Sequence, residues 1–347
     1  ELNFKAKYRH RGVAIEGAVS YENVAAMIDY LPKNGYNSYF LQFDTSYEFF
    51  ERWSLHKNNE KLAPEAFDIN EIYHKVVSEI KKRNLILHSV GHGWTAKAVG
   101  CDVTGWDKHE CEKDNELLAL VNGKRKYFKD VPSNTNLCYS NPAAQEAFAN
   151  CVADYAEKHP ETDVLHVWLA DDCKNFCECE NCKGLLPSDS YVLALNKIDE
   201  ILSARKIKTR IAFLAYCELL WAPVKYKIKN EDRFILMFAP ITRPFSQNIS
   251  DEAENSLYAK NEKFVLNKSA FPGDLTRNLA FLREWTNVFK GDSFIFDDPL
   301  MWEINKDIST LRLPGIIKKD VAGLEKLGLN GEISCQLQRA FFPHGYS

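Results

Sequence analysis

The sequence predicts an α/β protein built as a (β/α)8, or TIM, barrel, and three observations lead to this fold class. Short apolar runs alternate with longer amphipathic segments along most of the 347 residues. Eight such runs occur, and alternation of this kind implies parallel strands joined by right-handed crossovers. The glycine-rich dinucleotide or phosphate fingerprint is absent from the sequence; it often accompanies the rival fold, an open doubly wound sheet.

The expected strands share a short apolar core rich in β-branched and aromatic residues, bounded by turn residues. "YNSYFLQF" (36–43) illustrates the pattern, because aromatic residues fill it and a helix ending in glycine precedes it. The eight strands are expected at 12–17, 36–43, 85–93, 164–170, 209–216, 233–240, 293–298 and 331–337.

The expected helices show apolar residues at helical spacing, and several carry recognisable ends. Gly35 closes the first helix, and Asn141–Pro142 opens the third. The helices are expected at 21–35, 69–84, 143–159, 191–206, 279–289 and 316–328.

Two connections depart from the regular repeat. The segment 218–232, between the fifth and sixth strands, is too short and too proline-broken for a full helix. Only ten residues follow the last strand, so the closing helix is expected to be missing or to lie beyond this fragment. Long loops at 44–68 and 94–140 are expected to carry function, as loops of that length usually do.

Composition narrows the function classes. A formal net charge of −4, with both signs mixed along the chain, gives no sign of a nucleic-acid-binding surface. No apolar run approaches the roughly 20 residues that a membrane helix needs. Cysteine usage leaves the compartment open; a secreted or cell-envelope-associated protein is favoured over a cytoplasmic one.

Polar and aromatic side chains gather at the carboxyl ends of the expected strands, where the active sites of such barrels lie. A ring of carboxylates with tryptophans suits carbohydrate, because aromatic faces pack on sugar rings and acids can protonate a glycosidic oxygen. The alternative is that aspartate simply favours turns and helix caps. The candidate residues are Glu16, Asp44, His92, Trp94, Asp171, Asp172, Tyr216, Arg243, Asp297, Asp298 and Trp302.

Individual members of this ring have competing interpretations. His92 could bind a sugar hydroxyl, assist an acid or be structural. Trp94 and Trp302 could be sugar platforms or part of the core. Arg243 could bind the carboxylate of an acidic sugar or pair with an acid of the rim.

Four cysteines lie close together in "DDCKNFCECENC" (171–182), with the spacing C-x3-C-x-C-x2-C. Disulfides within so tight a run are awkward, whereas four thiolates around one structural zinc suit a loop. Free thiols or a redox pair are the alternatives. The expected ligands are therefore Cys173, Cys177, Cys179 and Cys182, and Cys138 is interpreted as a small buried apolar residue. No organic cofactor is expected.

Three stretches resemble the barrel of N-acetylhexosaminidase-type glycoside hydrolases of families 20 and 84: "RGVAIEG", "GYNSYFLQF" and "VWLADD". The "FDDP" of the seventh strand resembles the acid-bearing strand end of family 84. Those families place two adjacent acids after the fourth strand. The resemblance implies that Asp171 orients the substrate's acetamido group and that Asp172 protonates the leaving group.

A resemblance over nearly the whole chain is to the bacterial domain of unknown function 4838, through "ALVNGKR", "LCYSNP", "FCECENC", "LAYCELLWAP" and "LNGEISCQLQRAF". That family resembles a sugar-hydrolase barrel, often as one module of a longer protein, so residues 1–347 are expected to form one domain. Its pattern usually keeps only the second acid, which strengthens Asp172, followed by three cysteines, which leaves the fourth metal ligand open.

The sequence as a whole predicts a glycoside hydrolase acting on an N-acetylhexosaminide or a uronic-acid-containing glycan, with Asp172 as general acid and Asp171 assisting. One alternative is a barrel that binds carbohydrate without cleaving it. Another is a zinc-dependent hydrolase that uses the cysteine run, although a catalytic zinc prefers histidine-rich ligands and an open position.

Overall fold

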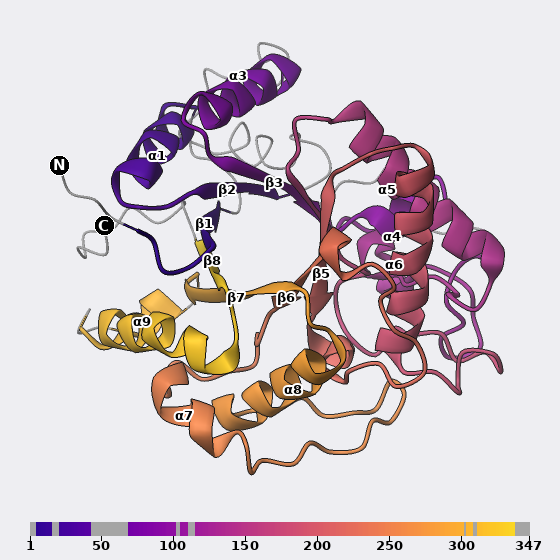
Figure 1. Ribbon diagram of the computed structural model, residues 1–347. Helices are drawn as coiled ribbons and strands as arrows, with labels where there is room; N and C mark the ends of the chain where they lie inside the picture. Colours follow the sequence, from indigo (N-terminus) through magenta and orange to yellow (C-terminus); the bar gives the residue numbers. More distant parts are fainter. Residues whose placement is uncertain are drawn as a thin grey trace.

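The structure is a computed structural model that describes residues 5–15, 21–42, 69–101, 105–109, 115–301, 303–307 and 311–336. Within these residues, eight parallel strands form a closed barrel in chain order, with helices outside them (Figure 1). The last strand pairs with the first over six residue pairs, from His10 with Gly331 to Ile15 with Gln336. The predicted (β/α)8 barrel is therefore confirmed.

Every expected strand is present. The strands are β1 (His10–Ile15), β2 (Ser38–Gln42), β3 (Ile86–Gly91), β4 (Val164–Val167), β5 (Arg210–Ala215), β6 (Phe234–Phe238), β7 (Asp292–Leu300) and β8 (Gly331–Gln336).

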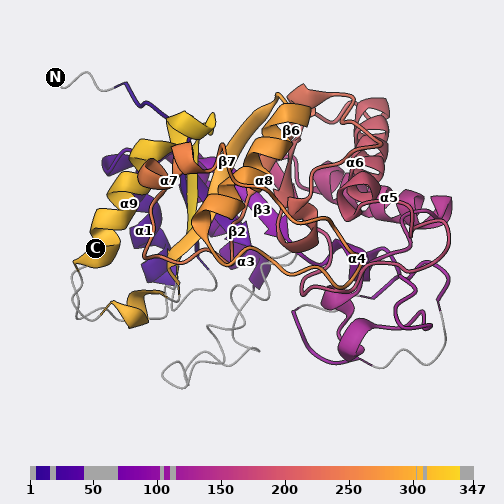
Figure 2. The same ribbon diagram turned by 90° about the horizontal axis from the view of Figure 1, so that it is seen from below.

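The helices cover the outside of these strands (Figure 2). They are α1 (Tyr21–Lys33), α3 (Ile69–Lys82), α4 (Trp94–Lys97), α5 (Pro142–Lys158), α6 (Pro187–Ala204), α7 (Ile249–Asn255), α8 (Leu275–Val288) and α9 (Arg312–Gly323). The short helices α4 and α7 were not expected, because a segment of one or two turns carries too few residues to show a period. Among the described residues, none of the helices has the length and apolar character to cross a membrane.

The connection from β5 to β6 holds 3-10 turns at Cys217–Leu220 and Glu231–Arg233 and no α-helix, as expected. Side chains of α6 replace the missing helix. Asp189 Oδ1 accepts hydrogen bonds from the backbone N–H groups of residues 224, 225 and 226, at 2.7–3.1 Å. Asn196 holds the next residues through Lys227 O and Lys229 N. The extended segment therefore lies against α6, and side chains of this helix satisfy five of its backbone groups.

Aromatic rings and two histidines fill the barrel interior. His88 and His166 are fully buried, and their Nδ1 and Nε2 atoms share a hydrogen bond of 2.9 Å. Burial lowers the pKa of both histidines well below the usual range, so both stay neutral. His166 stacks on Phe40 at 4.0 Å between ring centroids. The prediction that these two histidines are structural fits this packing.

A charged cluster closes the amino-terminal end of the barrel. Asp292, at the start of β7, accepts hydrogen bonds from His10, Arg210 and Asn330, and Arg9 lies 3.1 Å away. Burial alone would raise the pKa of Asp292, but these partners outweigh burial and lower it strongly. This end of the barrel is therefore held by ion pairs.

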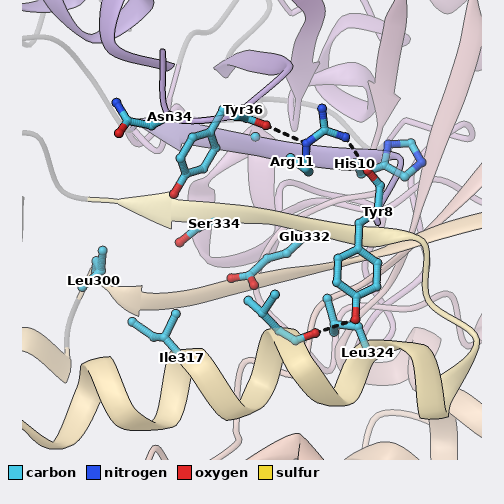
Figure 3. Close-up of a pocket in the computed structure, with 13 residues that line it drawn as sticks. Tyr8, His10, Arg11, Asn34, Tyr36, Leu300, Ile317, Leu324, Glu332 and Ser334 are labelled. Carbon is cyan, nitrogen blue, oxygen red and sulfur yellow. Dashed lines mark hydrogen bonds between the residues drawn. The ribbon is translucent and has the colours of Figure 1, made fainter. Parts of the chain in front are cut away.

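A cavity of about 280 Å³ lies outside the barrel, between the turn that follows α1 (residues 34–36) and helix α9, and against strands β1 and β8 (Figure 3). Tyr36, Glu332 and Ser334 face it, and Ile317 and Leu324 border it from the helix side. A helix following β8 would cover this face in a regular barrel. The expectation of a missing closing helix falls on residues 337–347, which lie outside the described residues.

Candidate active site

A second cavity, of about 220 Å³, lies at the carboxyl ends of the strands, where barrels of this type carry their active sites. Aromatic and apolar side chains form most of its wall, and a few polar groups converge on it, as is usual for small-molecule sites. The described residues that line it are Gln42, His92, Trp106, Trp168, Asp171, Leu214, Tyr216, Met237, Ala239, Ile241, Phe296, Asp298, Met301 and Cys335.

Of the residues predicted for the site, four line this cavity: His92, Asp171, Tyr216 and Asp298. Sequence reasoning missed most of the remaining wall. Trp106 lies in the long loop that was expected to carry function, and Trp168 is part of the "VWLADD" motif. Both tryptophans could have been found from those two signals.

Asp171 is surrounded by hydrogen-bond donors. Trp106 Nε1 donates to its Oδ2 at 3.0 Å, and the Tyr216 hydroxyl donates to its Oδ1 at 3.4 Å. The backbone N–H of Asp171 donates to Ser133 O at 2.9 Å, so the main chain is held as well. An ionised carboxylate can only accept hydrogen bonds, and each oxygen of Asp171 has a donor beside it.

His92, directly after β3, stands beside this acid. Its Nδ1 lies 2.9 Å from Leu169 O, and because a carbonyl can only accept, Nδ1 carries the proton. Its Nε2 faces Asp171 Oδ1 at 3.8 Å. Trp168 packs edge-on against the imidazole, with 4.8 Å between ring centroids. The ring is thereby fixed with one nitrogen directed toward the acid of the cavity.

Asp298 has the opposite environment. It shares the cavity wall with Phe296 and Met301, and only 9% of its surface is exposed. Burial and, secondly, the negative charge of Asp297 raise the pKa of Asp298 from 3.8 to about 7. A carboxyl of this kind can donate a proton near neutral pH.

Asp172, the predicted general acid, does not line the cavity. Its φ is +65°, an uncommon value for a residue other than glycine, and its Oδ2 accepts a hydrogen bond from the exposed Lys129. Partial burial alone would raise the pKa of Asp172, but the bonds from Lys129 and from the Cys173 backbone outweigh it and lower the pKa. The structure therefore places this acid beside the cavity, in the charged form.

Arg243 and Asp297 lie in the helix layer, not in the cavity. Alternate residues of a strand face opposite sides, so Phe296 and Asp298 face inward and Asp297 faces outward. The buried Arg243 donates to Asp297 at 2.7 Å and to Asp320 of α9 at 2.9 Å. The ion pair occupies the groups with which Arg243 and Asp297 were predicted to bind a substrate, and it fits the alternative interpretation that Arg243 pairs with an acid.

Trp94 also leaves the predicted site. The side chain is 1% exposed, its Nε1 donates to His166 O at 2.9 Å, and Tyr155 packs against it edge-on. The indole is therefore part of the core and no sugar platform, as one of its two interpretations allowed. Three further predicted residues, Glu16, Asp44 and Trp302, lie outside the described residues.

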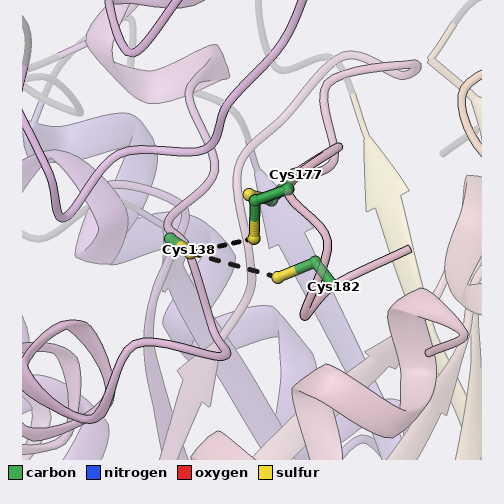
Figure 4. A group of neighbouring side chains, drawn as sticks. Cys138, Cys177 and Cys182 are labelled. Carbon is green, nitrogen blue, oxygen red and sulfur yellow. Dashed lines mark hydrogen bonds between the residues drawn. The ribbon is translucent and has the colours of Figure 1, made fainter. Parts of the chain in front are cut away.

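The cysteine cluster differs from the prediction in one member. Cys177, Cys179 and Cys182 gather with Cys138, and all four Sγ atoms lie within 4.8 Å of one another, close enough to hold a metal ion. Figure 4 labels Cys138, Cys177 and Cys182 of this group. Cys173, which was predicted as a ligand, is outside this group. Spacing within one run could not indicate Cys138, which lies 39 positions before Cys177 in the sequence.

Residues 101–268, just under half of the chain, match the model of the family described as Domain of unknown function (DUF4838). The resemblance seen in the sequence motifs is thereby confirmed over this stretch. No curated protein matches the sequence.

Three solved structures illustrate what the chain is similar to. An O-GlcNAc hydrolase from Thermobaculum terrenum is 8% identical, with a TM-score of 0.47 over 96% of this chain and 56% of that one. A glycoside hydrolase family 20 β-N-acetylglucosaminidase is 12% identical, with a TM-score of 0.49 over 96% and 65%. The cellulose synthase subunit Z of Clostridioides difficile is 12% identical, with a TM-score of 0.48 over 96% and 93%. The chain thus spans less than two thirds of the first two proteins.

Proposed function

We propose that this protein is a glycoside hydrolase, with Asp298 as the proton donor and Asp171 as the second carboxylate. The observation that carries the proposal is that one aromatic cavity at the strand ends holds two carboxyls in contrasting environments. Most glycosidases use two carboxyls, one of which must be protonated. Pairs of acids whose surroundings differ in this way are the usual sign of a division between acid and charge-stabilising roles.

Asp298 suits the acid role because its carboxyl is buried and its pKa is raised to about 7. Asp171 suits the second role, because Trp106 and Tyr216 donate to its oxygens and orient them. An oriented carboxylate can stabilise the positive charge of an oxocarbenium-like transition state or hold the N–H of a substrate acetamido group.

The lining of the cavity favours a neutral or N-acetylated sugar over a uronic acid. Trp106, Trp168, Tyr216 and Phe296 offer aromatic surface for a sugar ring. Among the described residues that line the cavity, there is no arginine or lysine to bind a sugar carboxylate. Arg243, which suggested an acidic sugar, is paired with Asp297 and Asp320.

Zinc is the ion that we propose for the cysteine cluster, because four sulfur ligands suit it. None of the four cysteines lines the cavity. Its role in this proposal is therefore structural, and the carboxyls carry the reaction.

The experiment is a hydrolysis assay on aryl and oligosaccharide N-acetylhexosaminides of both anomeric configurations, with three matched variants. Asp298→Asn should lower kcat about 10²–10⁴-fold on oligosaccharides. It should lower kcat much less on 4-nitrophenyl glycosides, because 4-nitrophenolate leaves without being protonated. Asp171→Asn should lower kcat on both kinds of substrate.

Asp172→Asn separates this assignment from the sequence-based one. If Asp298 is the acid, the change should alter kcat by no more than about threefold, as for a surface substitution. A large loss confined to poor leaving groups in Asp172→Asn would return the acid role to Asp172. Glycan binding measured by calorimetry, without hydrolysis of any substrate, would support the alternative of a non-catalytic carbohydrate-binding barrel.

A further inference from the structure

We infer that Cys138 is the fourth ligand of a closed tetrathiolate zinc site, and that this site fastens the loop before α5 to the loop after β4, which carries Asp171. The metal site itself does not depend on the proposed hydrolysis. Only its consequence for Asp171 rests on that function.

The spacing of the sulfurs fits one tetrahedral ion. Zn–S bonds of about 2.3 Å at tetrahedral angles hold the sulfurs about 3.8 Å apart. The Cys138 Sγ lies 3.7 Å from Cys179 Sγ and 4.0 Å from Cys182 Sγ. A polynuclear iron–sulfur cluster would hold its thiolates farther apart, since iron and inorganic sulfide lie between them. A disulfide needs a bond of about 2.05 Å, and all four cysteines are free.

Polar groups of the protein lie beside the sulfurs. The backbone N–H of Leu120 donates to Cys177 Sγ at 3.2 Å. The Cys182 thiol donates to the Ser140 hydroxyl at 3.1 Å, and a Cys182 thiolate would instead accept from that hydroxyl. Arg125 interacts with the Cys138 thiol, so a cation stands beside the negative charge that four thiolates and one zinc would carry. The cluster also packs against Ala119, which screens it from water on that side.

The four cysteines come from two segments far apart in the sequence. Cys138 lies in the loop before α5, and the other three lie in the loop after β4. Outside the cluster, Glu178 N donates to Leu120 O at 2.7 Å, and Asn122 N donates to the Glu178 carboxylate at 2.8 Å. A metal ion bound by the four cysteines would join the loop before α5 to the loop after β4.

The inner ends of the same two loops hold Asp171. Asn136, two residues before Cys138, donates through its side chain to Asn175 Oδ1 at 2.9 Å. Asn175, two residues before Cys177, donates to Asp171 O and Asn134 O, both at 2.7 Å. Asn136 and Asn175 are buried, so these bonds cannot be replaced readily by water. The zinc site and the asparagine pair therefore act as two successive fastenings between the loops.

The test compares wild type with Cys138→Ser and Cys173→Ser, expressed with zinc and analysed for metal by mass spectrometry. Cys173 is the matched control, because it belongs to the same run but lies outside the cluster. We expect one zinc per chain in wild type and in Cys173→Ser, and zinc affinity at least about 100-fold weaker in Cys138→Ser. Zinc retained at full affinity in Cys138→Ser, or lost in Cys173→Ser, would overturn the ligand set.

Cobalt substitution of the wild-type protein provides a test that does not depend on a variant folding. Co²⁺ bound by four thiolates gives the intense sulfur-to-metal charge-transfer bands of a tetrahedral site, and zinc should displace it. A spectrum typical of fewer thiolates would contradict the inference. So would iron in place of zinc in the purified protein, or a wild-type chain that binds neither metal when titrated.

Discussion

The carboxyl ends of β4 and β7 each carry two adjacent aspartates, and the structure separates each pair in the same way. Asp171 and Asp298 line the cavity, whereas Asp172 and Asp297 face away from it and pair with Lys129 and Arg243, respectively. One acid of each pair is thus available to a ligand, and the other is neutralised by a cation.

The two pairs differ in what surrounds each member. At β4 the inward acid receives hydrogen bonds from Trp106 and Tyr216, and the outward acid pairs with an exposed lysine. At β7 burial raises the pKa of the inward acid, and the outward ion pair is buried as well. A doublet of acids in a sequence therefore specifies neither a role nor a charge, because partners and burial decide both.

The largest expected effect concerns the β4 pair. Asp171→Asn should lower kcat about 10²–10⁴-fold, whereas Asp172→Asn should leave it nearly unchanged, because only Asp171 lines the cavity. Steady-state kinetics on one N-acetylhexosaminide measures both, and thermal unfolding checks that each variant folds. Equal losses in the two variants would remove the distinction between an inward and an outward acid.

The outward ion pair at β7 should have the largest effect on stability. Arg243→Gln leaves Asp297 and Asp320 buried without a cation and should lower the free energy of unfolding by about 3–5 kcal/mol. Urea denaturation at pH 7 measures the change. A loss below about 1 kcal/mol would mean that this pair behaves like a surface pair.

The inward acid of β7 should make stability depend on pH. The pKa of Asp298 is raised from 3.8 to about 7, so the folded state binds this proton more tightly than the unfolded chain does. The contribution of Asp298 to the free energy of unfolding is complete below about pH 4. It is lost as the pH rises through 7, and the loss is at most about 4 kcal/mol.

Asp298→Asn should remove that part of the decline, which unfolding midpoints at pH 5 and pH 8 would reveal. Asp320 and Glu332, whose pKa values are raised by burial to about 6 and about 8, will leave part of the pH dependence in the variant. An unchanged difference between the two midpoints would show that Asp298 ionises normally.

Metal removal tests how firmly the β4 acid is held. Chelation of zinc should loosen the loop before α5 from the loop after β4. Because the loop after β4 carries Asp171, its carboxylate would then be oriented less well, and kcat should fall about tenfold. Circular dichroism should report an intact barrel, because none of the four cysteines belongs to a strand. Full activity of the metal-free protein would confine the site to local stability.

The smallest effect is expected at the outward pair of β4. Lys129→Gln removes the partner of Asp172, but the lysine side chain is 60% exposed, so the free energy of unfolding should change by less than about 1 kcal/mol. The same urea experiment compares it directly with Arg243→Gln. If Lys129→Gln lowers the free energy of unfolding as much as Arg243→Gln does, the two ion pairs do not differ in their contribution to stability.

Local patterns in the sequence were sufficient for the barrel. Apolar runs, helical spacing and end signals such as Gly35 and Asn141–Pro142 depend on neighbours within a few residues, so they predicted all eight strands and the irregular segment between β5 and β6. The predicted strand ends also indicated where polar side chains would collect, and four of the predicted residues line the cavity.

Tertiary structure decided which of those groups face a ligand and which partners they have. Alternation along β7 directs Asp298 inward and Asp297 outward, but only the folded chain brings Arg243 and Asp320 to Asp297. Trp106 reaches Asp171 across 65 positions of sequence, and Cys138 reaches Cys177 across 39 positions. Contacts of this range are set by the packing of loops on the barrel, and no local spacing in a single sequence encodes them.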